Sequence, residues 1–232
     1  MKKPEIFQFK VEINRCYIIQ QEGTIMMDGG SPNQIESIKK SFKTLNINPK
    51  DIRLVVLSHG HFDHAGSAKE IRELTGAKIL VHKNDNDMLE TAEMIWPPAA
   101  NTWGSITRSI FKPLLKNKVK FQKTQADIVM EGSEFPLKDF GIDGKIIHTP
   151  GHTNGSISVL LNSGEAFVGC MAHNDLPFRL RPGFPIYAHD IPQLKKSWEM
   201  MIDMGATTIY PGHGDPFSVE VIQRILEKES HA

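Results

Sequence analysis

The sequence predicts an α/β fold, because short apolar runs typical of buried strands alternate with segments whose apolar residues recur at helical spacing. The run at residues 54–57 is entirely apolar and contains two valines, as expected of a strand covered on both faces. Residues 35–45 instead place their apolar side chains on one face of a helix. A chain of 232 residues with no internal repeat or low-complexity linker is expected to form a single domain over residues 1–232.

Two strands joined by a turn are expected near the N-terminus. Residues 16–19 and 24–27 are mostly apolar and flank a short polar segment that contains Gly23, a residue typical of hairpin turns. The second strand ends at Asp28, which two glycines follow. The Ser-Pro pair at 31–32 then predicts a helix start, because serine caps helices and proline suits the first helical position.

The remaining elements continue this alternation. The expected helices cover residues 67–74, where Gly76 would end the helix, residues 84–94, and a segment from about Ser218. The expected strands cover residues 77–81, 119–129 and 144–147.

The segment after the 54–57 run is the most informative part of the chain. It reads Ser-His-Gly-His-Phe-Asp-His and holds four potential metal ligands, His59, His61, Asp63 and His64. Imidazole and carboxylate suit zinc and other divalent first-row metals. Residues two apart in an extended loop point the same way, so the first two histidines can reach one ion together. The alternative is a polar loop whose histidines bond one another, which requires many buried hydrogen-bond partners.

Three later segments also place a candidate ligand directly after an expected strand. They are the Thr-Pro-Gly-His-Thr run with His152, the Gly-Cys pair with Cys170, and the Pro-Gly-His-Gly run with His213. With the His-x-His-x-Asp-His cluster, and in this order, these motifs resemble those of the metallo-β-lactamase superfamily of binuclear metallo-hydrolases. The resemblance implies a four-layer αββα sandwich with the metals at one edge between the two sheets.

The resemblance also implies two zinc ions per chain. The expected metal ligands are His59, His61 and His152 for one ion, and Asp63, His64 and His213 with Cys170 for the other. Asp63 has a second expected role as a catalytic residue that orients a metal-bound hydroxide. Asp28 is expected beneath the metal loop, where it would hold a ligand histidine. A plain turn aspartate is the alternative reading of that residue.

Cys170 marks a departure from most of the family, which carries an aspartate that bridges the two metals at this point. The Gly-Cys pair resembles one subclass of zinc β-lactamases, in which the cysteine binds the second zinc. His173 falls where those enzymes bind the substrate carboxylate, although that subclass usually lacks a histidine at the position of His64. As a ligand, Cys170 favours zinc over iron or manganese. A small buried thiol that binds nothing is the alternative.

Residues outside these motifs are expected to contact the substrate. Trp96 and Trp103 lie in an insert, residues 95–118, that is rich in aromatic residues and broken by proline. This composition favours a lid or pocket wall, with a packed surface loop as the alternative. Arg179 and Arg181 lie in a later proline-rich loop, where arginine can hold an anionic substrate group. Solvated loop arginines are the alternative.

Charge and hydropathy limit the partners. Lys+Arg and Asp+Glu number 27 each, so the formal net charge is zero, which argues against a nucleic-acid partner. No segment approaches the ~18 uncharged apolar residues of a bilayer span, and no signal peptide is evident. We therefore expect a small-molecule substrate, no membrane partner and a cytoplasmic location. The oligomeric state stays open.

The expected function is zinc-dependent hydrolysis by a metal-bound hydroxide, because a metal ion lowers the pKa of its bound water toward ~7. The expected substrates contain a carboxylic ester, thioester, lactone or β-lactam bond. One alternative is a phosphodiesterase with the same binuclear site. Another is a mononuclear iron protein that resembles an oxidoreductase, or a non-hydrolytic ligand-binding protein.

Overall fold

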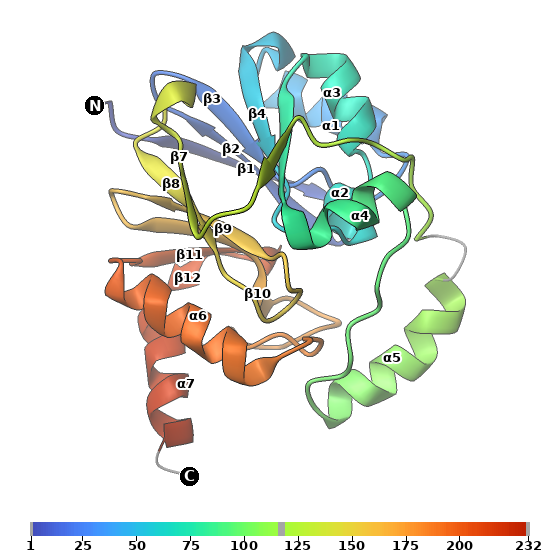
Figure 1. Ribbon diagram of the computed structural model, residues 1–232, viewed down its shortest axis with the longest axis vertical. Helices are drawn as coiled ribbons and strands as arrows, with labels where there is room; N and C mark the ends of the chain where they lie inside the picture. The colour runs from blue at the N-terminus through green and yellow to red at the C-terminus, as the bar shows by residue number, and fades with distance from the viewer. Residues whose placement is uncertain (1, 116–118, 231–232) are drawn as a thin grey trace.

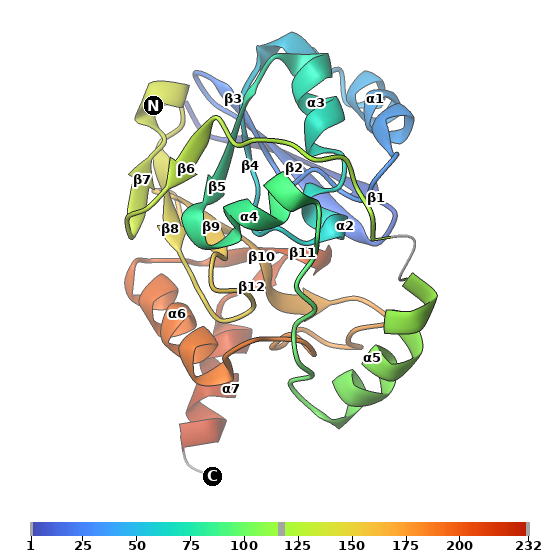
Figure 2. The same ribbon diagram turned by 45° about the vertical axis from the view of Figure 1, so that its right-hand side comes forward.

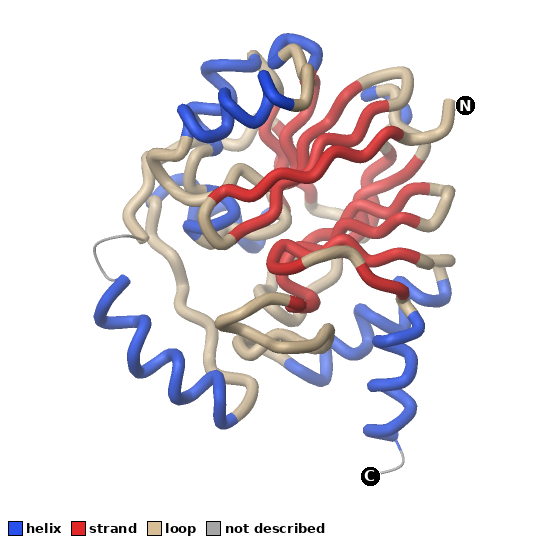
Figure 3. Tube along the Cα trace, turned by 180° about the vertical axis from the view of Figure 1, so that it is seen from behind, coloured by secondary structure: helices blue, strands red, loops and turns tan. Residues whose placement is uncertain are grey.

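Over residues 2–115 and 119–230, which the computed structural model describes, the chain forms two six-stranded sheets packed face to face (Figure 1). Helices lie on both outer faces of this pair, and Figure 3 shows the same layers from behind. The predicted α/β class and the four-layer αββα arrangement are therefore confirmed.

The first sheet has the strand order β1-β2-β3-β4-β5-β6. Its strands are β1 (Glu5–Val11), β2 (Asn14–Gln20), β3 (Thr24–Met27), β4 (Ile52–Val56), β5 (Lys78–His82) and β6 (Ile128–Met130). The predicted hairpin is confirmed, since β2 and β3 pair antiparallel with Ile18 opposite Met26. From β3 to β6 the pairing is parallel. The carboxyl ends of β4 and β5 therefore lie at the same edge of the sheet.

The second sheet has the order β12-β11-β10-β9-β8-β7. Its strands are β7 (Glu134–Pro136), β8 (Gly144–His148), β9 (Ile157–Leu161), β10 (Glu165–Asn174), β11 (Thr208–Gly214) and β12 (Phe217–Ser218). Only β10 and β11 pair parallel among these described strands, and their register sets His173 opposite His213. This pairing brings two distant sequence motifs to one end of the sheet.

Helices cover the outer faces of the two sheets. They are α1 (Ile35–Thr44) and α3 (Ala68–Thr75) on the first sheet, and α6 (Ile191–Asp203) and α7 (Glu220–Ser230) on the second. Near the edge where the sheets open lie α2 (Phe62–Ala65), α4 (Lys83–Thr91) and α5 (Thr102–Leu115). Single 3-10 turns occur at Pro49–Asp51 and Lys138–Phe140.

Apolar side chains fill the space between the sheets. Tyr17 of β2 and Phe167 of β10 meet edge to face at 5.2 Å between ring centroids. The Tyr17 hydroxyl donates to the carbonyl of Pro211 at 2.6 Å, which ties the first sheet to β11. Leu54 and Val56 of β4 are fully buried in the same cluster. The loop that follows β4 therefore starts from a rigid, buried strand.

Several expected element boundaries are wrong. Helix α1 begins at Ile35, not at the Ser-Pro pair, because the Ser31 carbonyl accepts a hydrogen bond from Ser67 and Asn33 adopts a left-handed φ of 60°. The strand expected over residues 119–129 is limited to Ile128–Met130. Only those residues of the segment form a ladder with β5.

The insert at residues 95–118 contains a helix, α5, that its composition did not predict. Helix α4 ends at Thr91, three residues before the expected end. Residues 116–118 of the insert lie outside the described residues. Within the described parts of the chain, no helix combines the length and the apolar character needed to cross a membrane.

Candidate metal centre

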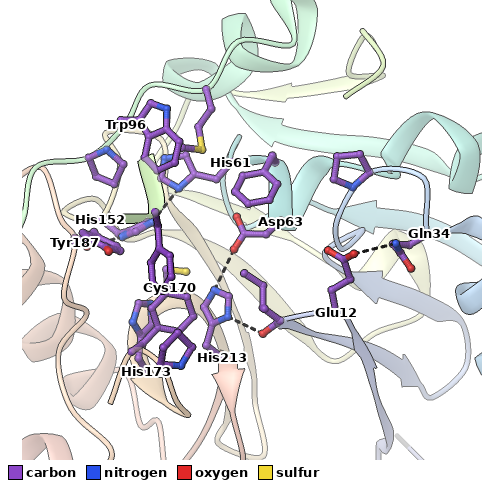
Figure 4. Close-up of a pocket in the computed structure, with 18 of the residues that line it drawn as sticks. Glu12, Gln34, His61, Asp63, Trp96, His152, Cys170, His173, Tyr187 and His213 are labelled. Carbon is purple, nitrogen blue, oxygen red and sulfur yellow. Dashed lines mark hydrogen bonds and ion pairs between the residues drawn. The ribbon is translucent and has the colours of Figure 1, made fainter. Parts of the chain in front are cut away.

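The loops after β4 and β8 meet the strands β10 and β11 at the open edge between the sheets, and polar side chains from these four segments point toward one another (Figure 4). Within the described residues, four groups of three side chains have ligand atoms within 4.8 Å of one another. The groups are His59–His61–His152, His59–His64–Cys170, Cys170–His173–His213 and Asp63–His64–His213. All these residues are buried. The structure thus brings together every side chain expected to bind metal.

The first group is built from the β4 loop and the loop after β8. His61 Nδ1 lies 3.2 Å from His152 Nε2. The outward nitrogens of these two rings face backbone carbonyls, that of Ile95 at 3.2 Å from His61 Nε2 and that of Tyr187 at 2.8 Å from His152 Nδ1. These contacts fix both rings and leave one nitrogen of each aimed into the centre.

His59 supplies the third nitrogen of that group. Its Nδ1 lies 2.9 Å from the Ser58 hydroxyl, whereas Nε2 is buried and has no hydrogen-bond partner among the described residues. An unpartnered polar atom in the interior is costly unless a ligand satisfies it. A metal ion bound by this group would be such a ligand.

The second group lies beside the first. Asp63 Oδ2 is 3.3 Å from His213 Nε2 and 3.8 Å from His64 Nε2. The other nitrogen of His213, Nδ1, lies 2.8 Å from the carbonyl of Ile13. Its Nε2 is therefore held toward the carboxylate, in an arrangement that suits a divalent cation.

Cys170 lies at the junction of the groups, with Sγ 3.2 Å from His64 Nε2. Burial raises the pKa of its thiol, but the positive charges of His64 and His213 outweigh this and hold the pKa well below its usual range. These surroundings favour the thiolate, the form of cysteine that binds metal.

The histidines of the centre fall into two groups according to the direction in which their pKa is shifted. Burial lowers the pKa of His61 to about 3 and also lowers that of His59. Burial acts in the same direction on His213, but the Cys170 thiolate and the Asp63 carboxylate raise its pKa to about 9. The anionic groups therefore draw positive charge to the second half of the centre, and a bound cation would take the place of those protons.

Asp28 lies beneath the centre, as expected. Its Oδ2 is 2.7 Å from His64 Nδ1, and its Oδ1 accepts a hydrogen bond from the backbone N–H of Ser58 at 2.7 Å. Asp28 has a left-handed φ of 63°.

Gly169 of β10, at a φ of 51°, lies against the β4 loop. A Cβ at this position would be 2.5 Å from the Ser58 side chain. Only glycine lets β10 approach the β4 loop this closely.

Asp85, in the first turn of α4, is a buried residue of this site that the sequence reasoning missed. Its Oδ2 accepts hydrogen bonds from the Gly60 N–H at 3.0 Å and the Thr153 hydroxyl at 2.8 Å, and its Oδ1 accepts from the Gly155 N–H at 2.9 Å. One buried carboxylate thus ties the β4 loop to the loop that carries His152. The available signal was its place just after β5, at the sheet edge shared with the β4 loop.

His173 joins the centre more closely than its expected substrate-binding role implied. It forms one of the four groups with Cys170 and His213, and neither of its ring nitrogens has a hydrogen-bond partner among the described residues. Burial lowers its pKa to about 4, so the ring is neutral. It is therefore a candidate ligand as well as a cavity residue.

A cavity of about 890 Å³ opens onto the centre. Of the expected substrate contacts, Trp96 and His173 line it. Trp103, Arg179 and Arg181 line a neighbouring hollow instead. Arg179 donates to the carbonyls of Arg181 and Phe184 in its own loop, so its guanidinium braces that loop. Cavity residues that the sequence reasoning did not single out include Phe178, Tyr187 and Glu12.

Comparison with known proteins places the chain in a family. The model of the metallo-beta-lactamase superfamily matches residues 10–213. The chain is similar to the probable metallo-hydrolase YflN of Bacillus subtilis, with 26% identity over 162 residues that cover 68% of this chain and 60% of that protein. It is also similar to the probable metallo-hydrolase MJ0888 of Methanocaldococcus jannaschii, with 24% identity over 87% of this chain and 88% of that protein.

Solved structures share this fold. A metallo-beta-lactamase family protein of Thermus thermophilus, TTHA1429, superposes with a TM-score of 0.70 at 18% identity, covering 97% of this chain and 78% of that one. The BLEG-1 B3 metallo-beta-lactamase gives 0.68 at 19% identity, covering 93% and 95%. With the family match over most of its length, the chain belongs to the metallo-beta-lactamase superfamily of metal-dependent hydrolases.

Proposed function

We propose that this protein is a zinc hydrolase that binds two ions per chain and cleaves a carboxylic ester, thioester, lactone or β-lactam bond. The observation that carries the proposal is the set of buried ligand groups, each within 4.8 Å, that includes the unpartnered Nε2 of His59. Histidine nitrogen together with thiolate favours zinc over harder metals, which prefer oxygen ligands.

The metal-ligand atoms of these side chains suit two zinc sites. His59, His61 and His152 would hold one ion. Asp63, His64 and His213 would hold the other, with Cys170 between the sites and His173 beside it. Zinc at these positions supplies an ionised water at neutral pH and an electrophile for the substrate oxygen.

Residues of the chain would position the attacking water and the ligand loops. Asp63 lies at the boundary of the two sites and its pKa is held below the usual range: burial raises it, but the charge of His64 and the hydrogen bond from His213 outweigh burial. It stays an anionic acceptor, able to orient the attacking water by a hydrogen bond. Asp28 and Asp85 hold the two ligand loops in place.

The cavity supports a substrate with an apolar part next to the bond that is cleaved. Its wall includes Met94, Trp96, Phe111 and Phe178, and its volume is about 890 Å³, a size that suits a small-molecule substrate. Neither cysteine forms a disulfide bond, which suits a reducing compartment such as the cytoplasm.

The first experiment is elemental analysis of wild type and Cys170→Ala, each purified without chelator and reconstituted with zinc. The proposal expects about two zinc ions per wild-type chain and about one in the variant. Two ions in both proteins would remove Cys170 from the ligand set and leave the rest standing. One iron per wild-type chain would overturn the zinc hydrolase in favour of the mononuclear iron alternative.

A substrate panel then tests the reaction class. Wild type and His152→Ala are assayed on a lactone, a thioester, a β-lactam and bis-nitrophenyl phosphate. The proposal expects turnover of a carbonyl substrate that His152→Ala loses. Turnover of the phosphodiester alone would replace the proposal by a phosphodiesterase. A zinc-loaded protein that turns over none of the panel but binds one of these compounds would favour a non-hydrolytic binding protein.

A further inference from the structure

Helix α5 exposes an unusual apolar stripe. Trp103, Ile106, Ile110 and Leu114 are all exposed, Leu114 to 68% of its surface. Their spacing of three and four residues puts them on one face of the helix. Figures 1 and 2 show α5 outside both sheets, at the edge of the molecule.

The opposite face of α5 attaches the helix to the protein, and two of its contacts are made by the small residues Gly104 and Thr107. Thr107 is buried, and its hydroxyl accepts a hydrogen bond from the Tyr187 hydroxyl at 2.6 Å. A Cβ at Gly104 would lie 2.2 Å from the carbonyl of Ile186. Four large apolar side chains of α5 thus face outward, whereas an ordinary surface helix buries its apolar face.

The loop beside α5 extends the apolar surface. The Trp103 indole N–H donates to the carbonyl of Pro177 at 3.1 Å. Leu176 and Leu180, on either side of that proline, are 62% and 84% exposed. Helix and loop therefore present one continuous surface, which we call the α5 face, defined by Trp103, Ile106, Ile110, Leu114, Leu176 and Leu180.

The segment that contains α5 is basic in its sequence. The sequence has no aspartate or glutamate between Met94 and Ala126, although it has six lysines and arginines there and the whole chain has a formal net charge of zero. Lys112 and Arg181 are exposed next to the apolar stripe. Among the described residues, neither is in an ion pair with an acidic side chain.

We propose that the α5 face docks on the surface of an anionic phospholipid bilayer. A helix with tryptophan, isoleucine and leucine on one side and basic residues nearby lies flat in the headgroup region, with its apolar side buried. Basic side chains add attraction to anionic lipid within about one Debye length of the surface. The expectation of no membrane partner concerned a spanning segment, and this face requires none.

Charge argues against a second copy of the chain as the occupant. In a two-fold symmetric dimer the same surface lies on both sides. Lys112 and Arg181 would then meet their own copies, with no acidic residue of the α5 face to balance them. An anionic bilayer instead complements them.

The α5 face also borders the cavity of the metal centre. Phe111 of α5 and Pro177 of the adjacent loop line that cavity. A bilayer bound at the α5 face would therefore lie next to the cavity mouth. Binding can nevertheless be measured without metal or substrate, so the test does not depend on the proposed hydrolase activity.

The test is co-sedimentation of the full-length protein with vesicles of phosphatidylcholine alone or mixed with phosphatidylglycerol. Wild type is expected to bind the mixed vesicles at least about ten-fold more tightly than the neutral ones, with binding weakened by salt. Ile106→Gln/Ile110→Gln is expected to lose about ten-fold in binding. Lys112→Glu/Arg181→Glu is expected to lose the preference for anionic vesicles.

Matched controls come from exposed residues elsewhere. Val129→Gln removes an exposed apolar side chain of β6, and Lys196→Glu reverses an exposed charge on α6. Both should bind like wild type, and circular dichroism checks that all variants are folded. No binding of wild type to the mixed vesicles would overturn the proposal, as would equal binding of every variant. A dimer in sedimentation equilibrium that Ile106→Gln/Ile110→Gln makes monomeric would overturn it in favour of a second copy.

Discussion

Asp28 Oδ2 and His64 Nδ1 lie 2.7 Å apart, and both side chains are almost completely buried. Asp28 directly follows β3, whereas His64 is in α2, so the contact joins the first hairpin to the segment of candidate ligands. The carboxylate fixes the orientation of the ring and leaves His64 Nε2 facing Cys170 and Asp63.

Asp28→Asn tests this contact. The amide keeps the shape but replaces a charged acceptor, so we expect the second zinc site to weaken about 10- to 100-fold while the first keeps its ion. Zinc titration against a competing chelator measures this. Asp203→Asn, at an exposed position of α6, is the matched control. Equal zinc affinities in Asp28→Asn and wild type would contradict the prediction.

Asp85→Asn should disturb both ligand loops. An amide cannot accept on both sides, so at least one of the three donors that now reach the carboxylate would lose its acceptor. We expect a loss of about 1–3 kcal/mol in the free energy of unfolding, the typical cost of a buried unsatisfied polar group. Urea denaturation measures it, with Asp87→Asn on the exposed side of α4 as the control. A loss no larger than that of the control would refute the role given to Asp85.

Removal of metal should destabilise the protein. A ligand that binds only the folded chain stabilises it by RT ln(1 + [L]/Kd), about 2.7 kcal/mol at a hundred-fold excess over Kd. Differential scanning calorimetry before and after chelation should therefore show a lower Tm without metal, restored by zinc. Cys170→Ala should show a smaller zinc-dependent rise than wild type. A Tm that does not respond to chelation or zinc in wild type would argue against ions in this centre.

The surroundings of His82, a residue outside the metal centre, predict that the stability of the protein depends on pH. Its ring stacks on His148 at 3.8 Å between centroids, and its Nδ1 accepts a hydrogen bond from the Asn84 N–H at the start of α4. Burial, then the charge of His148, lowers its pKa from 6.5 to about 4. Between these values the unfolded chain binds more protons, so stability rises with pH from about 4 to 6.5 and then levels off.

The variant His82→Asn isolates this effect, because asparagine can keep the cap acceptor but does not titrate. The difference in unfolding free energy between wild type and variant should increase from pH 4 to 6.5 and stay constant above. Denaturant melts across that range measure it. A difference that is flat with pH would show that His82 does not titrate differently in the folded chain.

The candidate ligands could be predicted from sequence because each motif is local. The spacing of His59, His61 and His64 within one loop already limits what they can reach, and the Gly-Cys and Pro-Gly-His motifs each follow an apolar run typical of a strand. Asp85 could not be found in this way, because it acts on Gly60 and Thr153, which only folding brings near. Its sequence neighbourhood is that of an ordinary helix start.

Elements whose bounds depend on neighbouring residues in the sequence could be predicted. Elements whose bounds depend on contacts between distant residues could not. The hairpin of β2 and β3 is formed by two apolar runs and a turn that are adjacent in the sequence. The start of α1 does not, since the tertiary contact of Ser31 with Ser67 displaces the cap that its sequence favours. The composition of the insert predicts a lid, a pocket wall or a packed surface loop and does not indicate a helix, because the outward apolar face of α5 depends on the tertiary contacts of Gly104 and Thr107.

The groups of candidate ligands draw on both sheets. His64, which follows β4, and His213, in β11, lie 3.4 Å apart although 149 residues separate them in the sequence. An ion held by both would be a reversible cross-link, comparable to a disulfide that closes a long loop of the unfolded chain. Loss of the ion would first loosen the strand ends at the edge where the two sheets open. The core around Tyr17 and Phe167 would stay packed. Amide exchange at the strand ends of β4 and β11 would therefore report metal occupancy before any other part of the molecule.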